Sequence, residues 1–198
     1  MFNRKIFNMG DAYDVLFAAS IIGNLDIIKE IFERYKNIDV NVSNDSDIAA
    51  LHNAVAYNHI DVAEYLISKG AWINITDKNG KTPLHIATEI DEPEIAAFLL
   101  AHGAKVDVRD TDGWTPLHMA VIHKFYDMAK LLIRYHSKIN VEDSNGYTPL
   151  DYAKDEQMIS ILTRGKRTSL GNKLPVDVIF EGKEQEDKNG KRFYTTSF

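Results

Sequence analysis

The stretch DGWTPLHMA, Asp112 to Ala120, decides the fold because close copies of it recur along the chain. NGKTPLHIA begins at Asn79 and NGYTPLDYA begins at Asn145, so glycine, threonine and proline return at one constant interval. A shorter form, AALHNA, begins at Ala49 and keeps the same spacing. Self-similarity at a fixed period of this length indicates a repeat architecture, in which each unit is one small structural element.

Each repeat reads as a pair of helices. Thr82 and Thr115 are suited to the N-cap of a helix, and Pro83 and Pro116 follow at the first helical position, where a missing N–H costs nothing. A second apolar segment follows in each unit, as VAEYLI, EIAAFLL and DMAKLLI, and glycine comes soon after the first two of these. One such pair cannot bury its apolar face alone, so we expect the units to stack into a continuous core.

The chain resembles the ankyrin repeat family. The motifs that carry the resemblance are DKNGKTPLHIA, DTDGWTPLHMA, LISKGAWINI and LLAHGAKVDV. Their spacing also matches the period of about 33 residues that is expected of ankyrin repeats. The resemblance implies an all-α solenoid of stacked helix-turn-helix units with β-hairpin-like loops.

The resemblance covers residues 11–164, after an N-terminal lead of residues 1–10. The expected units are 11–43, 44–76, 77–109, 110–142 and 143–164. The first and the shortened fifth unit are interpreted as caps.

The recurring histidines, His52, His85 and His118, raise the question of chemistry. Zinc requires ligand atoms about 2 Å from the metal, whereas equivalent side chains on stacked helices lie roughly 8–10 Å apart. The histidine of this motif is structural in the resembled family, and we predict the same role here. The residues predicted to be structural are Thr82, Pro83, His85, Thr115, Pro116 and His118. No metal ligand, cofactor site or catalytic residue is predicted, since no nucleophile elbow, H-E-x-x-H or phosphate-loop motif is present.

Composition narrows the range of partners and compartments. Hydrophobic residues make up 44% of the 198 residues, the net charge is -6, and there is no cysteine. A mildly acidic chain argues against bulk nucleic-acid binding. The N-terminal sequence has no apolar core of the length a signal peptide needs, and no stretch approaches a membrane span. We therefore expect a cytoplasmic protein, although the sequence leaves export by a specialised system open.

The family resemblance also maps a partner-binding surface, formed by the loop tips before each T-P-L-H motif and by the exposed side of the first helices. The predicted contact residues are Asp45, Ser46, Ile48, Tyr57, Lys78, Asn79, Lys81, Glu89, Ile90, Arg109, Thr111, Asp112, Trp114, Ile122, His123, Glu142, Ser144, Asn145 and Tyr147. Trp114 is the sharpest candidate because aromatic residues are enriched at binding hot spots. The alternative is that it packs over a neighbouring loop.

The predicted function is a non-enzymatic adaptor or scaffold that binds a protein partner, with a monomer as the default state. The alternative is a specific inhibitor of an enzyme, such as a toxin immunity protein or a pathogen effector acting on a host protein.

A C-terminal extension, residues 165–198, follows the repeats and is expected to form a short hairpin or a flexible tail. VDVIF at 176–180 and RFYTTSF at 192–198 are strand-like, with a charged run between them. Ser169 in KRTSL is a candidate phosphorylation site. Thr196-Ser197-Phe198 fits the C-terminal motif that PDZ domains bind.

Overall fold

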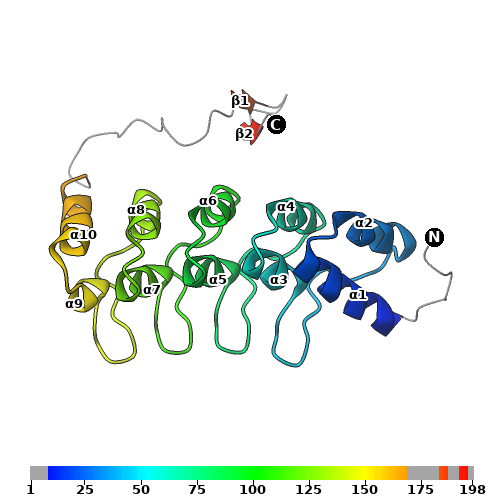
Figure 1. The fold of residues 1–198 in the computed structure, drawn as a ribbon, viewed down its shortest axis with the longest axis horizontal. Helices are drawn as coiled ribbons and strands as arrows, with labels where there is room; N and C mark the ends of the chain where they lie inside the picture. The colour runs from blue at the N-terminus through cyan, green and yellow to red at the C-terminus, as the bar shows by residue number, and fades with distance from the viewer. Residues whose placement is uncertain (1–8, 169–182, 187–191, 196–198) are drawn as a thin grey trace. The chain divides into compact units, whose positions relative to one another are not determined.

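The structure is a computed structural model that describes residues 9–168, 183–186 and 192–195. It divides into two compact units, residues 1–165 and 166–198, which are treated separately below. In the first unit, helix pairs stand side by side in chain order, and long loops project from the row of first helices (Figure 1). The expected all-α repeat solenoid is therefore confirmed for the described part of this unit.

Two rows of helices form the array. The first helices of the successive units are α1 (Met9–Ile22), α3 (Ala50–Ala56), α5 (Pro83–Glu89), α7 (Pro116–Ile122) and α9 (Pro149–Tyr152). The second helices are α2 (Leu25–Arg34), α4 (Ile60–Ser68), α6 (Pro93–Ala101), α8 (Tyr126–Arg134) and α10 (Glu156–Thr168). Helix α1 begins before the predicted start of the repeats at residue 11, and α10 continues past their predicted end at residue 164.

The first helices begin where the sequence predicts. Thr82, Thr115 and Thr148 are the N-cap residues of α5, α7 and α9, and a proline opens each of these helices. Proline is favoured at this position because its fixed φ suits the first turn and its absent N–H would have no partner there. The T-P dipeptide therefore sets the register of each repeat.

The core is built from equivalent positions in successive units. The leucines of the first helices are almost fully buried, and so are the alanines that follow three residues later; they are Leu16, Leu51, Leu84 and Leu117, with Ala19, Ala54, Ala87 and Ala120. The second helices contribute a further buried series, Leu66, Leu99 and Leu132. The small alanines let neighbouring helices approach closely, and the leucines fill the space between units, so each interface depends on both neighbours.

Each projecting loop is closed by a side chain that recurs once in every repeat. One Asp110 carboxylate oxygen accepts hydrogen bonds from the backbone N–H groups of Asp112 and Trp114, at 3.0 and 2.8 Å. The oxygens of Asn44, Asp77 and Asp143 make the same pair of bonds in their own loops. These bonds, together with backbone bonds across each loop, give the loops the hairpin-like form that the resemblance implies.

Successive loops are also joined to one another. Backbone N–H groups of Lys78, Thr111 and Ser144 donate to carbonyls of the preceding loops. The approach is so close that a Cβ added at Gly113 would lie 2.6 Å from the Ser144 nitrogen, which explains the glycine at this position. The loops therefore form a connected row rather than separate projections.

The turn after α8 departs from the pattern of its neighbours. Gly70 and Gly103 end α4 and α6 with positive φ, and His136 takes the same left-handed conformation after α8, with φ of 66°. A side chain costs free energy in this conformation because its Cβ crowds the backbone carbonyl. His136 is exposed, so its side chain does not offset that cost by burial.

We therefore expect His136→Gly to stabilise the chain by about 1 kcal/mol. Urea unfolding monitored by circular dichroism measures the change. A matched control is His102→Gly, where the native residue is at the end of α6 with an ordinary negative φ of -93°. That substitution should destabilise the chain, since it adds backbone freedom without relieving strain. A His136→Gly chain that is less stable than the parent would contradict the argument.

The second unit contains one described antiparallel hairpin, in which β1 (Lys183–Glu186) pairs with β2 (Arg192–Thr195). Strand β2 lies in the strand-like run at 192–198, whereas β1 lies in the charged run between the two strand-like runs. The other strand-like run, residues 176–180, lies outside the described residues, and so do Ser169 and Thr196-Ser197-Phe198. Among the described helices, none is long and apolar enough to cross a membrane.

Candidate protein-binding surface

The three motif histidines join each repeat to the next. In His85, Nδ1 accepts the backbone N–H of Thr82 at 3.1 Å, and Nε2 donates to the carbonyl of Trp114 in the following loop, also at 3.1 Å. His52 and His118 repeat the arrangement, with Nε2 donating to carbonyls of the following units. Both ring nitrogens of each imidazole are therefore committed to the backbone, as a structural role predicts.

The same contacts fix the protonation of these rings. Because Nδ1 accepts a backbone N–H, it carries no proton, and the neutral ring must hold its proton on Nε2. Burial lowers the pKa of His52, His85 and His118 below the ordinary value of 6.5, and it outweighs the opposing contribution of the carbonyls that accept from the rings. The folded chain thus favours neutral histidines at three successive interfaces.

Trp114 takes part in a polar and aromatic cluster between the fourth and fifth units. Its indole N–H donates to a carboxylate oxygen of Asp143 at 3.1 Å, and the same oxygen accepts the Tyr152 hydroxyl at 2.6 Å. The ring of Tyr152 meets those of Trp114 and Tyr147 edge to face. Trp114 is half-buried, which supports the alternative that it packs over the neighbouring loop.

Asp143 is the centre of this cluster. Burial alone would raise the pKa of Asp143, but hydrogen bonds from the Tyr152 hydroxyl, from the backbone N–H groups of Tyr147 and Asn145 and from the Trp114 indole lower it well below its usual range. The sequence interpretation missed this residue. The signal that could have found it was the regular recurrence of aspartate at the start of DKNG, DTDG and DSNG.

The residues predicted to contact a partner are all at least partly accessible. Those classed as exposed are Asp45, Tyr57, Lys78, Asn79, Glu89, Ile90, Arg109, Thr111, Asp112, His123, Glu142, Ser144, Asn145 and Tyr147. Those that are half-buried are Ser46, Ile48, Lys81, Trp114 and Ile122. We call this set the inner surface. The row of loops brings its loop residues together, because each loop is bonded to the one before it.

Three of these side chains occupy equivalent places at the ends of the first helices. Tyr57, Ile90 and His123 are the C-cap residues of α3, α5 and α7. Tyr57 is 56% exposed and Ile90 37% exposed, and His123 stacks on Phe125 with ring centroids 5.4 Å apart. Stacked repeats place equivalent residues in a row, so these side chains follow one another along the array.

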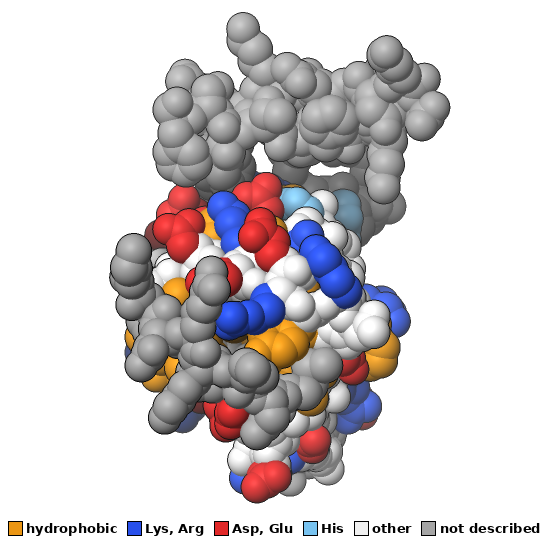
Figure 2. All heavy atoms as spheres, turned by 90° about the vertical axis from the view of Figure 1, so that its right-hand side faces the viewer, with side chains coloured by type: hydrophobic (Ala, Val, Ile, Leu, Met, Phe, Trp, Pro, Cys, Tyr) orange, Lys and Arg blue, Asp and Glu red, His pale blue; other side chains and the backbone are white. Residues whose placement is uncertain are grey.

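The charges of the inner surface are of both signs. Its basic residues are Lys78, Lys81 and Arg109, and its acidic residues are Asp45, Glu89, Asp112 and Glu142. Lys81 forms an ion pair with Glu89 at 2.8 Å. Figure 2, which looks onto the N-terminal end of the array, likewise shows acidic and basic side chains interspersed with hydrophobic ones. A mixed surface of this kind is typical of protein interfaces rather than of nucleic-acid grooves.

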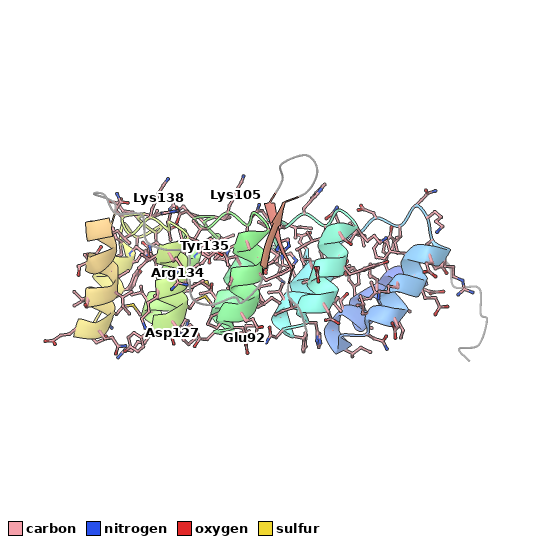
Figure 3. All side chains as sticks on the ribbon, turned by 90° about the horizontal axis from the view of Figure 1, so that it is seen from above. Glu92, Lys105, Asp127, Arg134, Tyr135 and Lys138 are labelled. Atoms are coloured by element: carbon pink, nitrogen blue, oxygen red, sulfur yellow. The ribbon has the colours of Figure 1, made fainter. Side chains whose placement is uncertain are left out.

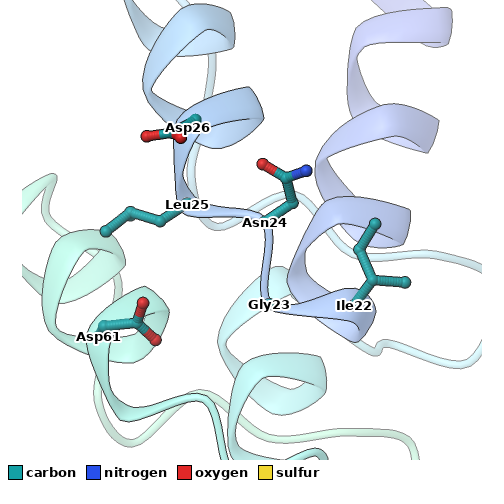
Figure 4. Close-up of a pocket in the computed structure, with 6 residues that line it drawn as sticks. All are labelled: Ile22, Gly23, Asn24, Leu25, Asp26 and Asp61. Atoms are coloured by element: carbon teal, nitrogen blue, oxygen red, sulfur yellow. The ribbon is translucent and has the colours of Figure 1, made fainter.

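The depressions found on the described surface do not form a chemical site. One lies at the turn between α1 and α2 and is lined by Ile22, Gly23, Asn24, Leu25, Asp26 and Asp61 (Figure 4). It is shallow and open, and its two carboxylates belong to different helix starts, where acidic residues favour the helix dipole. Among the described residues, no group of three or more histidine or acidic side chains is arranged to hold a metal ion.

Comparison with known sequences agrees with this architecture. A family described as ankyrin repeats (3 copies) matches residues 15–110, and one described as ankyrin repeats (many copies) matches residues 99–153. The chain therefore belongs to the ankyrin repeat family, whose repeats form protein–protein interaction modules.

One curated relative is alpha-latrocrustotoxin-Lt1a from Latrodectus tredecimguttatus, which is 49% identical over 59 residues. The match covers 30% of this chain and 4% of the toxin. The match is shorter than two repeats of about 33 residues. The likeness therefore concerns the repeat sequence and not the activity of the whole relative.

Proposed function

We propose that this chain is a non-enzymatic adaptor that binds a protein partner through the inner surface. The observation that carries the proposal is the exposure of large apolar side chains at places where the repeat core does not use them. Tyr57 is 56% exposed and Tyr147 is 53% exposed, and both lie within the inner surface. Tyrosine is among the residues most enriched in binding hot spots, because it offers a large contact area together with a hydroxyl.

The fixed form of the loops supports this proposal. Each loop is closed by two hydrogen bonds to one side-chain oxygen and is bonded to the next loop through its backbone. A partner that docks on the loops therefore orders few new torsions, and a smaller entropy cost leaves more of the contact free energy as affinity. The expected mechanism is rigid surface complementarity.

The double variant Tyr57→Ala with Tyr147→Ala should weaken partner binding by at least about tenfold, as expected for removal of two hot-spot side chains. Thermal stability should change little, because both side chains are exposed. The intact chain first captures its partner, which mass spectrometry identifies, and calorimetric titration then compares the affinities of parent and variant.

Two further variants control this experiment. Ile159→Ala removes an exposed apolar side chain that lies outside the inner surface and should leave this affinity unchanged. Trp114→Ala should lower the melting temperature, because it breaks the bond to Asp143. Parent affinity in the double tyrosine variant would reject the inner surface as the binding site.

A further inference from the structure

We propose a second interaction surface, which binds an acidic, extended protein segment and lies away from the inner surface. It is formed by the ends of the second helices and the turns that follow them, and we call it the basic edge. Its members are Lys69, Trp72, Lys105, Arg134 and Lys138, all of which are exposed. Figure 3 shows Lys105 and Lys138 projecting from one long edge of the array, with Glu92 and Asp127 on the opposite edge.

The backbone of the basic edge is held by a repeated contact between units. The N–H of Trp72 donates to the Asn41 side-chain oxygen at 2.7 Å, and the N–H of Lys105 donates to that of Asn74 at 2.8 Å. A third bond of the same kind, at 3.0 Å, fixes the N–H of Lys138. Since the three positions are equivalent in successive repeats, the three side chains project in a row from a fixed main chain.

The exposed charged side chains of the basic edge are all cations, and the half-buried carboxylate of Asp107 accepts the N–H of Lys138 and the hydroxyl of Ser137. The segments 69–72, 102–105 and 134–138 contain lysine, arginine and histidine but neither aspartate nor glutamate. Lys105, Arg134 and Lys138 form no ion pair with the described acidic side chains, unlike Lys81, Lys124 and Lys130. The carbonyl ends of the second helices favour nearby cations, but Lys105 and Lys138 lie in the turns beyond the last helical residues. Their charges are therefore available to carboxylates of a partner.

Trp72 gives the basic edge an apolar contact. Its side chain belongs to the row of Lys105 and Lys138 and is 66% exposed, although tryptophan is one of the most buried residue types on average. Asp39 occupies the equivalent turn one unit earlier, where its backbone N–H donates to the Tyr13 hydroxyl oxygen. The charge along the row therefore changes from negative at Asp39 to positive at Lys105 and Lys138. The carboxylates of the partner should consequently lie over the third and fourth units.

The spacing of the row indicates an extended segment. Neighbouring stacked units lie roughly 8–10 Å apart, which is close to the repeat of about 9 Å in a segment of extended polyproline II conformation, where every third side chain projects from the same side. A segment with a carboxylate at every third position can therefore match Lys105 and Lys138 together. Nucleic acid places negative charges much more densely than this row of cations, and a single exposed tryptophan offers little apolar surface to a bilayer.

The test uses the full-length chain carrying Trp114→Phe, so that Trp72 is the sole source of tryptophan fluorescence. The probe is a synthetic dodecapeptide with glutamate at every third position and one leucine near its end, where it can cover Trp72. We expect a blue shift of the Trp72 emission on titration. Raising the ionic strength should weaken binding, because the contacts involve exposed charges.

Matched variants decide between outcomes. Lys105→Gln with Lys138→Gln should reduce the affinity for the peptide at least tenfold, and both changes keep a polar side chain of similar length. Tyr147→Ala, on the inner surface, should bind the peptide like its parent, which separates this proposal from the proposed function. An unchanged Trp72 emission would overturn the proposal, and so would tighter binding of a single-stranded oligonucleotide or of anionic lipid vesicles than of the peptide.

Discussion

Replacing His85 with alanine should lower the free energy of unfolding by about 3 kcal/mol, because two hydrogen bonds to the backbone are lost and a cavity is left. The imidazole is fully buried, and both of its nitrogens are hydrogen-bonded to the backbone. Its removal leaves the N–H of Thr82 without this partner, at roughly 1–3 kcal/mol for a buried group. The carbonyl of Trp114 loses one donor but still accepts the N–H of Asp110 at 2.9 Å. The space left by the ring adds a cavity cost. Equilibrium unfolding in urea, followed by circular dichroism, measures the loss.

Two companion variants separate the contacts of this ring. His85→Asn retains an acceptor near the position of Nδ1 but cannot reach the next loop, so we expect it to lose about half as much stability. His123→Ala removes an exposed histidine of the same array and should change stability by less than about 0.5 kcal/mol. If His85→Ala were as stable as His123→Ala, the histidine would not be the joint between repeats that the hydrogen bonds describe.

Stability should also fall as the pH drops below 6.5. The pKa values of His52, His85 and His118 are lowered by burial from 6.5, so in the pH range between the two states' values the unfolded chain binds more protons than the folded chain. Stability is therefore fully present above pH 6.5 and is lost as pH falls, until the lowered pKa values are reached. Each histidine contributes a slope of up to about 1.4 kcal/mol per pH unit.

Urea unfolding at a series of pH values between 7.5 and 4.5 tests this expectation. The variant His85→Asn should show a shallower dependence, because one of the three titrating groups is gone. A parent chain whose stability stays constant from pH 7 to 5 would show that the buried rings do not titrate in this window. Protonation of Asp143, whose pKa is lowered, belongs to a more acidic range and does not interfere.

Much of this fold could be predicted because one local rule is repeated. The T-P dipeptide predicts the start of the first helix in the third, fourth and fifth units, and the period of 33 residues extends the pattern back to AALHNA in the second. The structural role of His85 was predicted from the family resemblance and from the distance between stacked repeats, which is too long for a shared metal ion. The helix starts depend on contacts between residues that are close in the sequence, so the spacing of residue types is enough to predict them.

What could not be predicted depends on contacts between units. The position of Trp114 in its loop is compatible with exposure or with packing, and the sequence does not reveal its bond to Asp143 in the next loop. The basic edge was equally hidden, since its cations belong to different repeats and only stacking brings them into one row.

Asp151, which replaces the motif histidine in the fifth unit, makes only some of the contacts that the histidine makes in the earlier units. Asp151 accepts the N–H and the hydroxyl of Thr148, at 2.8 and 2.7 Å, so it performs the half of the histidine's task that lies within its own unit. A carboxylate has no N–H to offer to a following loop. The fifth unit therefore lacks the side-chain donor that joins the earlier units to the loops that follow them. A further unit added by duplication would find no donor waiting for its backbone, and lengthening this protein by evolution or design would begin with restoring histidine at position 151.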